Sequence, residues 1–178
     1  MIYRIDPDTL EVLQSGRYVP EYAPPTPLTD RLSGLFEAVE AEEQTHSCRS
    51  NMKQLSLAAM MYAQDWDMHL PQGNWTEELL PYTQNPMIYR CPSRPALSVG
   101  FAFNERVLGA SIWDLAQPSD TVIMFGSDLG GDAPVGGAAA VPEGGIHDGL
   151  VTVGFADGHV KMMAPAELQE MLERDPFK

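Results

Sequence analysis

"NMKQLSLAAMMYAQDW", residues 51–66, carries a strong hydrophobic periodicity. Its apolar residues recur in steps of three and four: Met52, Leu55, Ala59, Tyr62 and Trp66. Residues at this spacing share one face of an α-helix. Because no proline or glycine interrupts residues 35–66, the pattern predicts one long helix over about residues 30–67.

The first half of this helix carries its own apolar residues at helical spacing: Leu32, Leu35, Phe36 and Val39. A helix of more than thirty residues is roughly 50 Å long at 1.5 Å per residue. It is therefore longer than the domain beside it should be. We expect these four residues to form an assembly surface that packs on a neighbouring subunit or on the N-terminal arm.

Residues 1–28 are expected to form that arm and a linker. Asp6-Pro7-Asp8 is a turn signal between two short apolar runs, which predicts a small hairpin or strand arm. "PEYAPPTPL", residues 20–28, holds four prolines and predicts a stiff, extended linker. An arm of this kind suits strand addition to the sheet of a neighbouring molecule.

Residues 29–178 read as one domain, in which a sheet over about residues 87–163 follows the long helix. The clearest hairpin is "VTVGFADGHVKMM", residues 151–163, with Asp157-Gly158 as a two-residue turn. Its alternation of apolar with small or polar residues predicts one buried face. A last helix is expected over about residues 165–174. The fold class is therefore α+β, with a long N-terminal helix on a small antiparallel sheet.

The chain of 178 residues carries a net charge of −14. Such a surface repels phosphate backbones and anionic lipids, so we expect no nucleic-acid partner. No stretch is long and apolar enough to span a membrane, and the N-terminus lacks a signal-peptide pattern. The missing signal favours the cytoplasm.

Several polar residues are candidates for a site. Asp128 and Asp132 lie in a glycine-rich loop where Ca²⁺ could find oxygen ligands, although a plain solvated loop explains them more simply. Asp65, Asp67 and His69 could hold a metal, but hydrogen bonds to the following loop explain them more simply. A metal-dependent hydrolase would use His147, Asp148, Asp157 and His159. A straight strand would put His147 and Asp157 about 30 Å apart, however, so they should not share a metal.

The common nucleophile, phosphate-loop and dinucleotide motifs are absent from the sequence, so we expect no enzymatic activity. Cys48 follows His46, but we expect this thiol to lie on a helix surface beside acidic residues and to be unreactive. Two cysteines, Cys48 and Cys91, could form one disulfide; their number alone leaves this open.

Four motifs in order resemble a known family. "CRSNMKQLSLAAMMYAQDWDMHLP" is followed by "YRCPS", by "PSDTVIMFGSD", and by His147 with nine residues before Asp157-Gly158. This arrangement resembles the pilin-like relatives of type II secretion pseudopilins that carry a C-terminal H-x9-DG motif. The similarity runs from about residue 48 to residue 161.

The resemblance implies a pseudopilin-like fold and a non-catalytic role in surface filaments or secretion-like assemblies. It implies a Cys48–Cys91 disulfide, a location outside the cell, and Ca²⁺ in a loop of the sheet region. Residues 1–47 depart from the family pattern because they contain neither a prepilin peptide nor an apolar anchoring helix.

The sequence therefore predicts a structural subunit that forms a homo-oligomer or filament through its N-terminal arm and helix. The alternative is a soluble binding module that captures a cation, a small ligand or a partner protein on its acidic loops.

Overall fold

The computed structural model describes residues 2–5, 12–16 and 28–178, with side chains from residue 32 onward. The chain divides into two compact units, Met1–Glu37 and Ala38–Lys178. The first contains strands β1 (Ile2–Ile5) and β2 (Val12–Gly16), which pair antiparallel. The expected Asp6-Pro7-Asp8 turn and the proline-rich linker lie outside the described residues.

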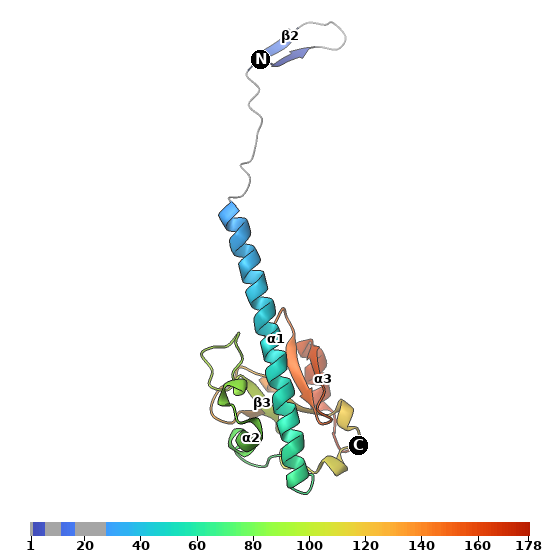
Figure 1. The fold of residues 1–178 in the computed structure, drawn as a ribbon. Coiled ribbons are helices and arrows are strands. Elements are labelled where there is room, and N and C mark those ends of the chain that lie inside the picture. Colours follow the sequence, from blue (N-terminus) through green and yellow to red (C-terminus); the bar gives the residue numbers. More distant parts are fainter. Residues whose placement is uncertain (1, 6–11, 17–27) are drawn as a thin grey trace. The chain divides into compact units, whose positions relative to one another are not determined.

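Helix α1 spans Leu28–Asp65 without a break (Figure 1), as the periodicity predicted. It ends where the backbone turns left-handed, at Asp67 (φ 48°) and Met68 (φ 63°). The amide of Met68 then bonds the carbonyl of Ala63 at 2.7 Å. This bond satisfies one of the carbonyls that a helix leaves free at its C-terminus.

The second unit holds a five-stranded mixed sheet with the order β5-β3-β4-β6-β7. The strands are β3 (Phe101–Asn104), β4 (Val122–Gly126), β5 (Val135–Gly136), β6 (Val151–Phe155) and β7 (Val160–Met163). All neighbours pair antiparallel except β3 and β5, which are parallel. The prediction of a purely antiparallel sheet is wrong at this edge, because the chain crosses beyond β3 after β4 and returns along its outer side.

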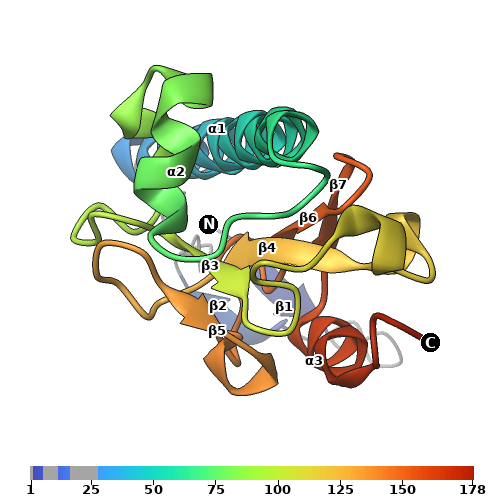
Figure 2. The same cartoon turned by 90° about the horizontal axis from the view of Figure 1, so that it is seen from below.

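The sheet lies between helices (Figure 2). Helices α1 and α2 (Trp75–Thr83) cover one face, and α3 (Pro165–Glu173) covers the other. Met52 and Leu55 of α1 share one core with Phe101 of β3, while Leu168 of α3 shares the second core with Phe125 of β4. Short 3₁₀ helices complete the unit: η1 (Pro86–Tyr89), η2 (Ile112–Asp114), η3 (Pro118–Asp120) and η4 (Ala138–Ala140).

Strand β6 is buried on both faces, which corrects the prediction of a single buried face. Val151, Val153 and Phe155 belong to the core under α3. Thr152 and Gly154 lie instead against α1, where a Cβ on Gly154 would stand 3.0 Å from the sulfur of Met52. The missing side chain therefore lets the helix approach the sheet closely.

The two-residue turn of the hairpin region lies at Asp148-Gly149 and not at Asp157-Gly158. Asp148 (φ 50°) and Gly149 (φ 79°) form the two-residue turn, in which His147 and Leu150 exchange both backbone hydrogen bonds. Asp157-Gly158 belongs to a three-residue connection, because the amide of Phe155 bonds the carbonyl of His159 and only Gly158 has positive φ. The prediction of a two-residue turn at Asp157-Gly158 is thus wrong.

Candidate functional site: a buried cysteine–histidine cluster

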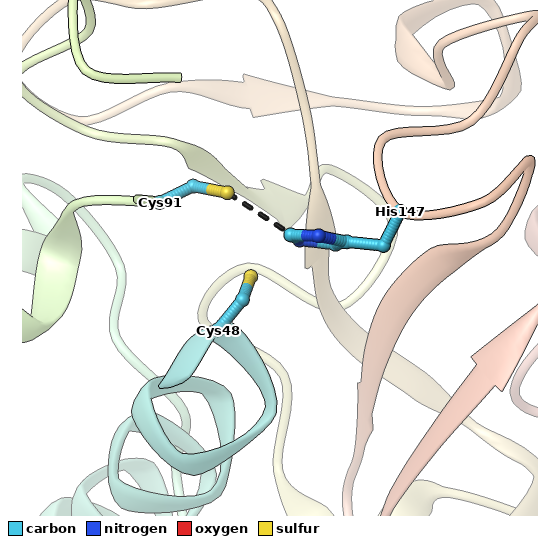
Figure 3. A group of neighbouring side chains, drawn as sticks. All are labelled: Cys48, Cys91 and His147. Carbon is cyan, nitrogen blue, oxygen red and sulfur yellow. Dashed lines mark hydrogen bonds between the residues drawn. The ribbon is translucent and has the colours of Figure 1, made fainter. Parts of the chain in front are cut away.

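Cys48, Cys91 and His147 point toward one another inside the second unit (Figure 3). All three side chains are buried, and their ligand atoms lie within 4.8 Å of one another. The sulfur of Cys91 is 3.5 Å from Nε2 of His147, and the two sulfurs are about 3.6 Å apart. Within the described part of the chain, no other group of three cysteine, histidine or acidic side chains converges this closely.

The position of Cys48 follows from the close packing of α1 on β6. The hydroxyl of Thr152 on β6 lies 3.7 Å from the Cys48 sulfur and donates to it. One turn further along α1, the side-chain amide of Asn51 donates to the carbonyl of Arg90 at 3.0 Å. This bond ties the helix to the segment that carries Cys91.

Cys91 follows the short helix η1 and packs directly against Gly100. A Cβ on Gly100 would lie 2.6 Å from the Cys91 Cβ and 2.8 Å from its backbone nitrogen, so only glycine permits this approach. The Cys91 carbonyl accepts a bond from the amide of Arg94 at 2.9 Å, which closes a turn after the cysteine. The thiol is thereby directed inward.

His147 is held by the Asp148-Gly149 turn, and its ring is oriented by two hydroxyls. Nδ1 lies 3.2 Å from Oγ1 of Thr45 and 3.3 Å from Oγ of Ser93. The Thr45 hydroxyl already donates to the Ala41 carbonyl, and that of Ser93 to Oε1 of Gln44.

Because both hydroxyls donate elsewhere, each can only accept a hydrogen bond from His147. The hydrogen-bond network therefore assigns the ring proton to Nδ1. In the neutral form of the ring, Nε2 then carries the lone pair, and this atom faces the sulfur of Cys91.

The two thiols have opposite pKa shifts. The hydrogen bond from Cys48 lowers the pKa of Cys91 against the effect of burial, and a hydrogen bond from the Ser93 amide lowers it further. The same hydrogen bond, together with burial, raises the pKa of Cys48 far above its usual value. Cys48 is therefore the hydrogen-bond donor of the pair, and Cys91 is the acceptor.

The structure brings the two predicted disulfide partners together but does not join them: both cysteines are free thiols. The expected disulfide is absent because the sulfurs stand about 3.6 Å apart, a hydrogen-bonding separation rather than a covalent one. The prediction that Cys48 lies on a helix surface is wrong, since its side chain is fully buried under β6 and the Cys91 segment.

The other predicted site residues lie apart from this cluster. The Asp128 carboxylate pairs with the guanidinium of Arg94, and Asp132 is exposed. Calcium binding by this loop stays a prediction. At the β6–β7 turn, Asp157 accepts hydrogen bonds from the amide and imidazole of His159.

The proposed hydrolase residues therefore divide between two places: His147 joins the cysteines, whereas Asp157 and His159 bond one another. Near α1, the carboxylate of Asp65 accepts a hydrogen bond from Tyr82, and Nδ1 of His69 meets the carbonyl of Asp67 at 3.0 Å.

Sequence reasoning missed His147 as the third member of the cluster. It placed His147 in the H-x9-DG motif and in a hydrolase candidate with Asp148, Asp157 and His159, but never with Cys48 and Cys91. The available signal was the order of the motifs: the histidine and both cysteines each belong to one of the quoted blocks.

A separate candidate surface lies on the N-terminal half of α1. Leu32, Leu35, Phe36 and Val39 expose 44%, 60%, 70% and 48% of their surface. The acidic residues Glu37, Glu40, Glu42 and Glu43 on the same half of the helix are also exposed. None of the described helices is long and apolar enough to cross a bilayer.

Comparison of the chain with protein-family models, curated proteins and solved structures found no match.

Proposed function

We propose that this chain is a non-enzymatic structural subunit of a pilus-like or other self-assembling filament, and that copies associate through the N-terminal half of α1. The observation that carries the proposal is the exposure of Leu32, Leu35, Phe36 and Val39 on one continuous helix. Their spacing of three, one and three residues places them on a single stripe.

The two halves of α1 differ in what covers their apolar residues. From Cys48 onward the stripe of Met52, Leu55 and Ala59 is fully buried against the sheet. In the N-terminal half, Phe36 remains 70% exposed. Burying an exposed side chain of this size contributes roughly 1.5–3 kcal/mol, and monomeric proteins rarely expose such a continuous group.

A second copy of α1 is the occupant that fits this stripe best. Apolar residues at positions i, i+3, i+4 and i+7 form the seam by which two helices pack in a coiled coil, and such a seam is self-complementary. The resemblance of residues 48–161 to pilin-like proteins also supports assembly from identical subunits.

The seam is short and ends in negative charge. Glu42 and Glu43 follow Val39 at the positions that would continue the stripe, and both are exposed. Each contact between two helices is therefore weak, and like charges oppose it. A filament would require further contacts. We expect the N-terminal arm to supply them.

The test compares two double variants of the same helix. Leu35→Ser with Phe36→Ser removes the centre of the stripe. Leu57→Ser with Met61→Ser removes side chains of similar exposure, 47% and 50%, from the half of α1 that packs on the sheet. Particle mass by light scattering should rise with concentration for the wild type and for the second variant only. Equal masses for all three proteins would contradict the assigned surface.

A further inference from the structure

We propose that Cys48, Cys91 and His147 bind one Zn²⁺ ion. The proposal rests on two sulfurs and one imidazole nitrogen that converge within 4.8 Å at a buried point. It is independent of the proposed assembly through α1, because the cluster lies inside the second unit and includes none of the exposed stripe residues.

Two of the three separations between the ligand atoms match those that a tetrahedral zinc ion imposes. Zinc binds thiolate sulfur at about 2.3 Å and imidazole nitrogen at about 2.0–2.1 Å, so tetrahedral angles separate two sulfurs by about 3.8 Å and sulfur from nitrogen by about 3.6 Å. The structure has about 3.6 Å between the sulfurs and 3.5 Å between the Cys91 sulfur and Nε2 of His147. The Cys48 sulfur and the His147 ring nitrogen lie within 4.8 Å, so an ion could enter once these two atoms stand about 3.6 Å apart.

The tautomer of His147 is already the one that a metal ligand needs. Its Nδ1 proton goes to the hydroxyls of Thr45 and Ser93, which leaves the Nε2 lone pair directed at the cysteines. Histidines that bind metals commonly donate their second ring N–H to an oxygen in this way, which fixes the orientation of the ring. Thr45 and Ser93 are therefore positioning residues.

The charge and softness of the site favour zinc over hard cations. One Zn²⁺ with two thiolates and a neutral imidazole carries no net charge, which suits a site whose three side chains are at most 4% exposed. Hard cations such as Mg²⁺ and Ca²⁺ prefer oxygen ligands and are disfavoured here. The chain supplies three ligands, and a water molecule would complete the tetrahedron.

Such an ion would connect three segments that are distant in the sequence. Cys48 belongs to α1, Cys91 follows η1, and His147 precedes the Asp148-Gly149 turn. Binding to the folded state alone raises the apparent stability of the protein. The role that follows is structural: zinc would fasten α1 to the sheet.

The experiment uses the full chain, reduced and stripped of metal by a chelator. Zinc is titrated against a chromophoric competitor, and Co²⁺ is added to a second sample. We expect one zinc ion per chain, a higher melting temperature, and a cobalt–thiolate charge-transfer band. If the reduced wild-type protein binds no zinc, the proposal is overturned.

Variants then assign the ligands. Cys91→Ser and His147→Gln should each weaken zinc binding at least a hundredfold, and Ser93→Ala should weaken it about 10–100-fold through the orientation of the ring. His69→Ala removes a histidine outside the cluster and should bind zinc as the wild type does.

Circular dichroism of each variant controls for unfolding. If a cysteine variant does not fold, the wild-type titration and His147→Gln still decide the question. Wild-type affinity in a folded His147→Gln would overturn the assignment.

Discussion

Gly154 of β6 lies directly under Ser56 of α1, so that a Cβ on Gly154 would overlap the Ser56 hydroxyl. The Ser56 Oγ is buried and has no hydrogen-bond partner among the described residues. A buried hydroxyl without a partner is destabilising in itself. The close contact between α1 and β6 is thus locally destabilising at Ser56 and Gly154. The same contact places Cys48 beside Cys91.

This contact predicts a non-additive pair of substitutions. Gly154→Ala should lower the free energy of unfolding by about 1–3 kcal/mol, because the added methyl group forces α1 away from β6. Ser56→Ala should be neutral to stabilising, because it removes a buried hydroxyl that makes no hydrogen bond.

In the double variant, Ser56→Ala should recover part of the loss caused by Gly154→Ala, because it vacates the space that the new methyl group needs. Urea denaturation of all four proteins measures the coupling. If the double variant changes the free energy of unfolding by the sum of the two single changes, the two side chains do not compete for this space.

The Asp148-Gly149 turn beside His147 predicts that alanine substitutions at two glycines differ in their effect on stability. Gly149→Ala should cost about 1–2 kcal/mol, because alanine must adopt a left-handed conformation at φ 79°. Gly144 is the matched control: it has no positive φ, and a Cβ added there would meet no described atom within 4 Å. Thermal melts of the two variants compare them. Equal losses would exclude backbone strain as the cause.

Asp157 predicts a pH-dependent contribution to stability. Burial acts to raise the pKa of its carboxyl, but hydrogen bonds from the His159 amide and imidazole outweigh this and lower the pKa. A carboxyl with a lowered folded-state pKa stabilises the protein above its unfolded pKa of about 3.9, and this contribution is lost as the pH falls through the folded-state value.

Asp157→Asn should therefore destabilise the protein at neutral pH, by less than about 1 kcal/mol because the side chain is 39% exposed. The difference in the free energy of unfolding between the variant and the wild type should become smaller as the pH falls. Urea denaturation from about pH 7 down to about pH 3 measures it. Asp132→Asn removes the same charge from an exposed position and controls for the net charge. A loss of stability by Asp157→Asn that stays constant over this range would contradict the argument.

The sequence predicted those elements whose signals are local. The steps of three and four from Met52 to Trp66 predicted α1, and the alternation of residues 151–155 predicted β6. The parallel pairing of β5 with β3 has no local signal, because it depends on where the chain goes after β4. The burial of Thr152 and Gly154 was missed for a similar reason: small and polar residues look exposed until a helix is placed on them.

The candidate site was predicted in part. The sequence paired Cys48 with Cys91, and the structure places them in contact, although not as a disulfide. His147 lies 56 positions beyond Cys91, and nothing in its neighbourhood indicates that its ring reaches the cysteines. His147 meets the two cysteines only in the folded chain, where Cys91 packs closely on Gly100 and the Asp148-Gly149 turn holds His147.

Sedimentation velocity of the full chain tests the proposed self-association most directly. Self-association through the exposed stripe of α1 predicts that the average mass increases with protein concentration. It also predicts that the increase is larger at high salt, because salt screens the repulsion between the acidic residues that border the stripe. A sedimentation coefficient that stays at the value for one chain at every concentration and salt level would contradict the account.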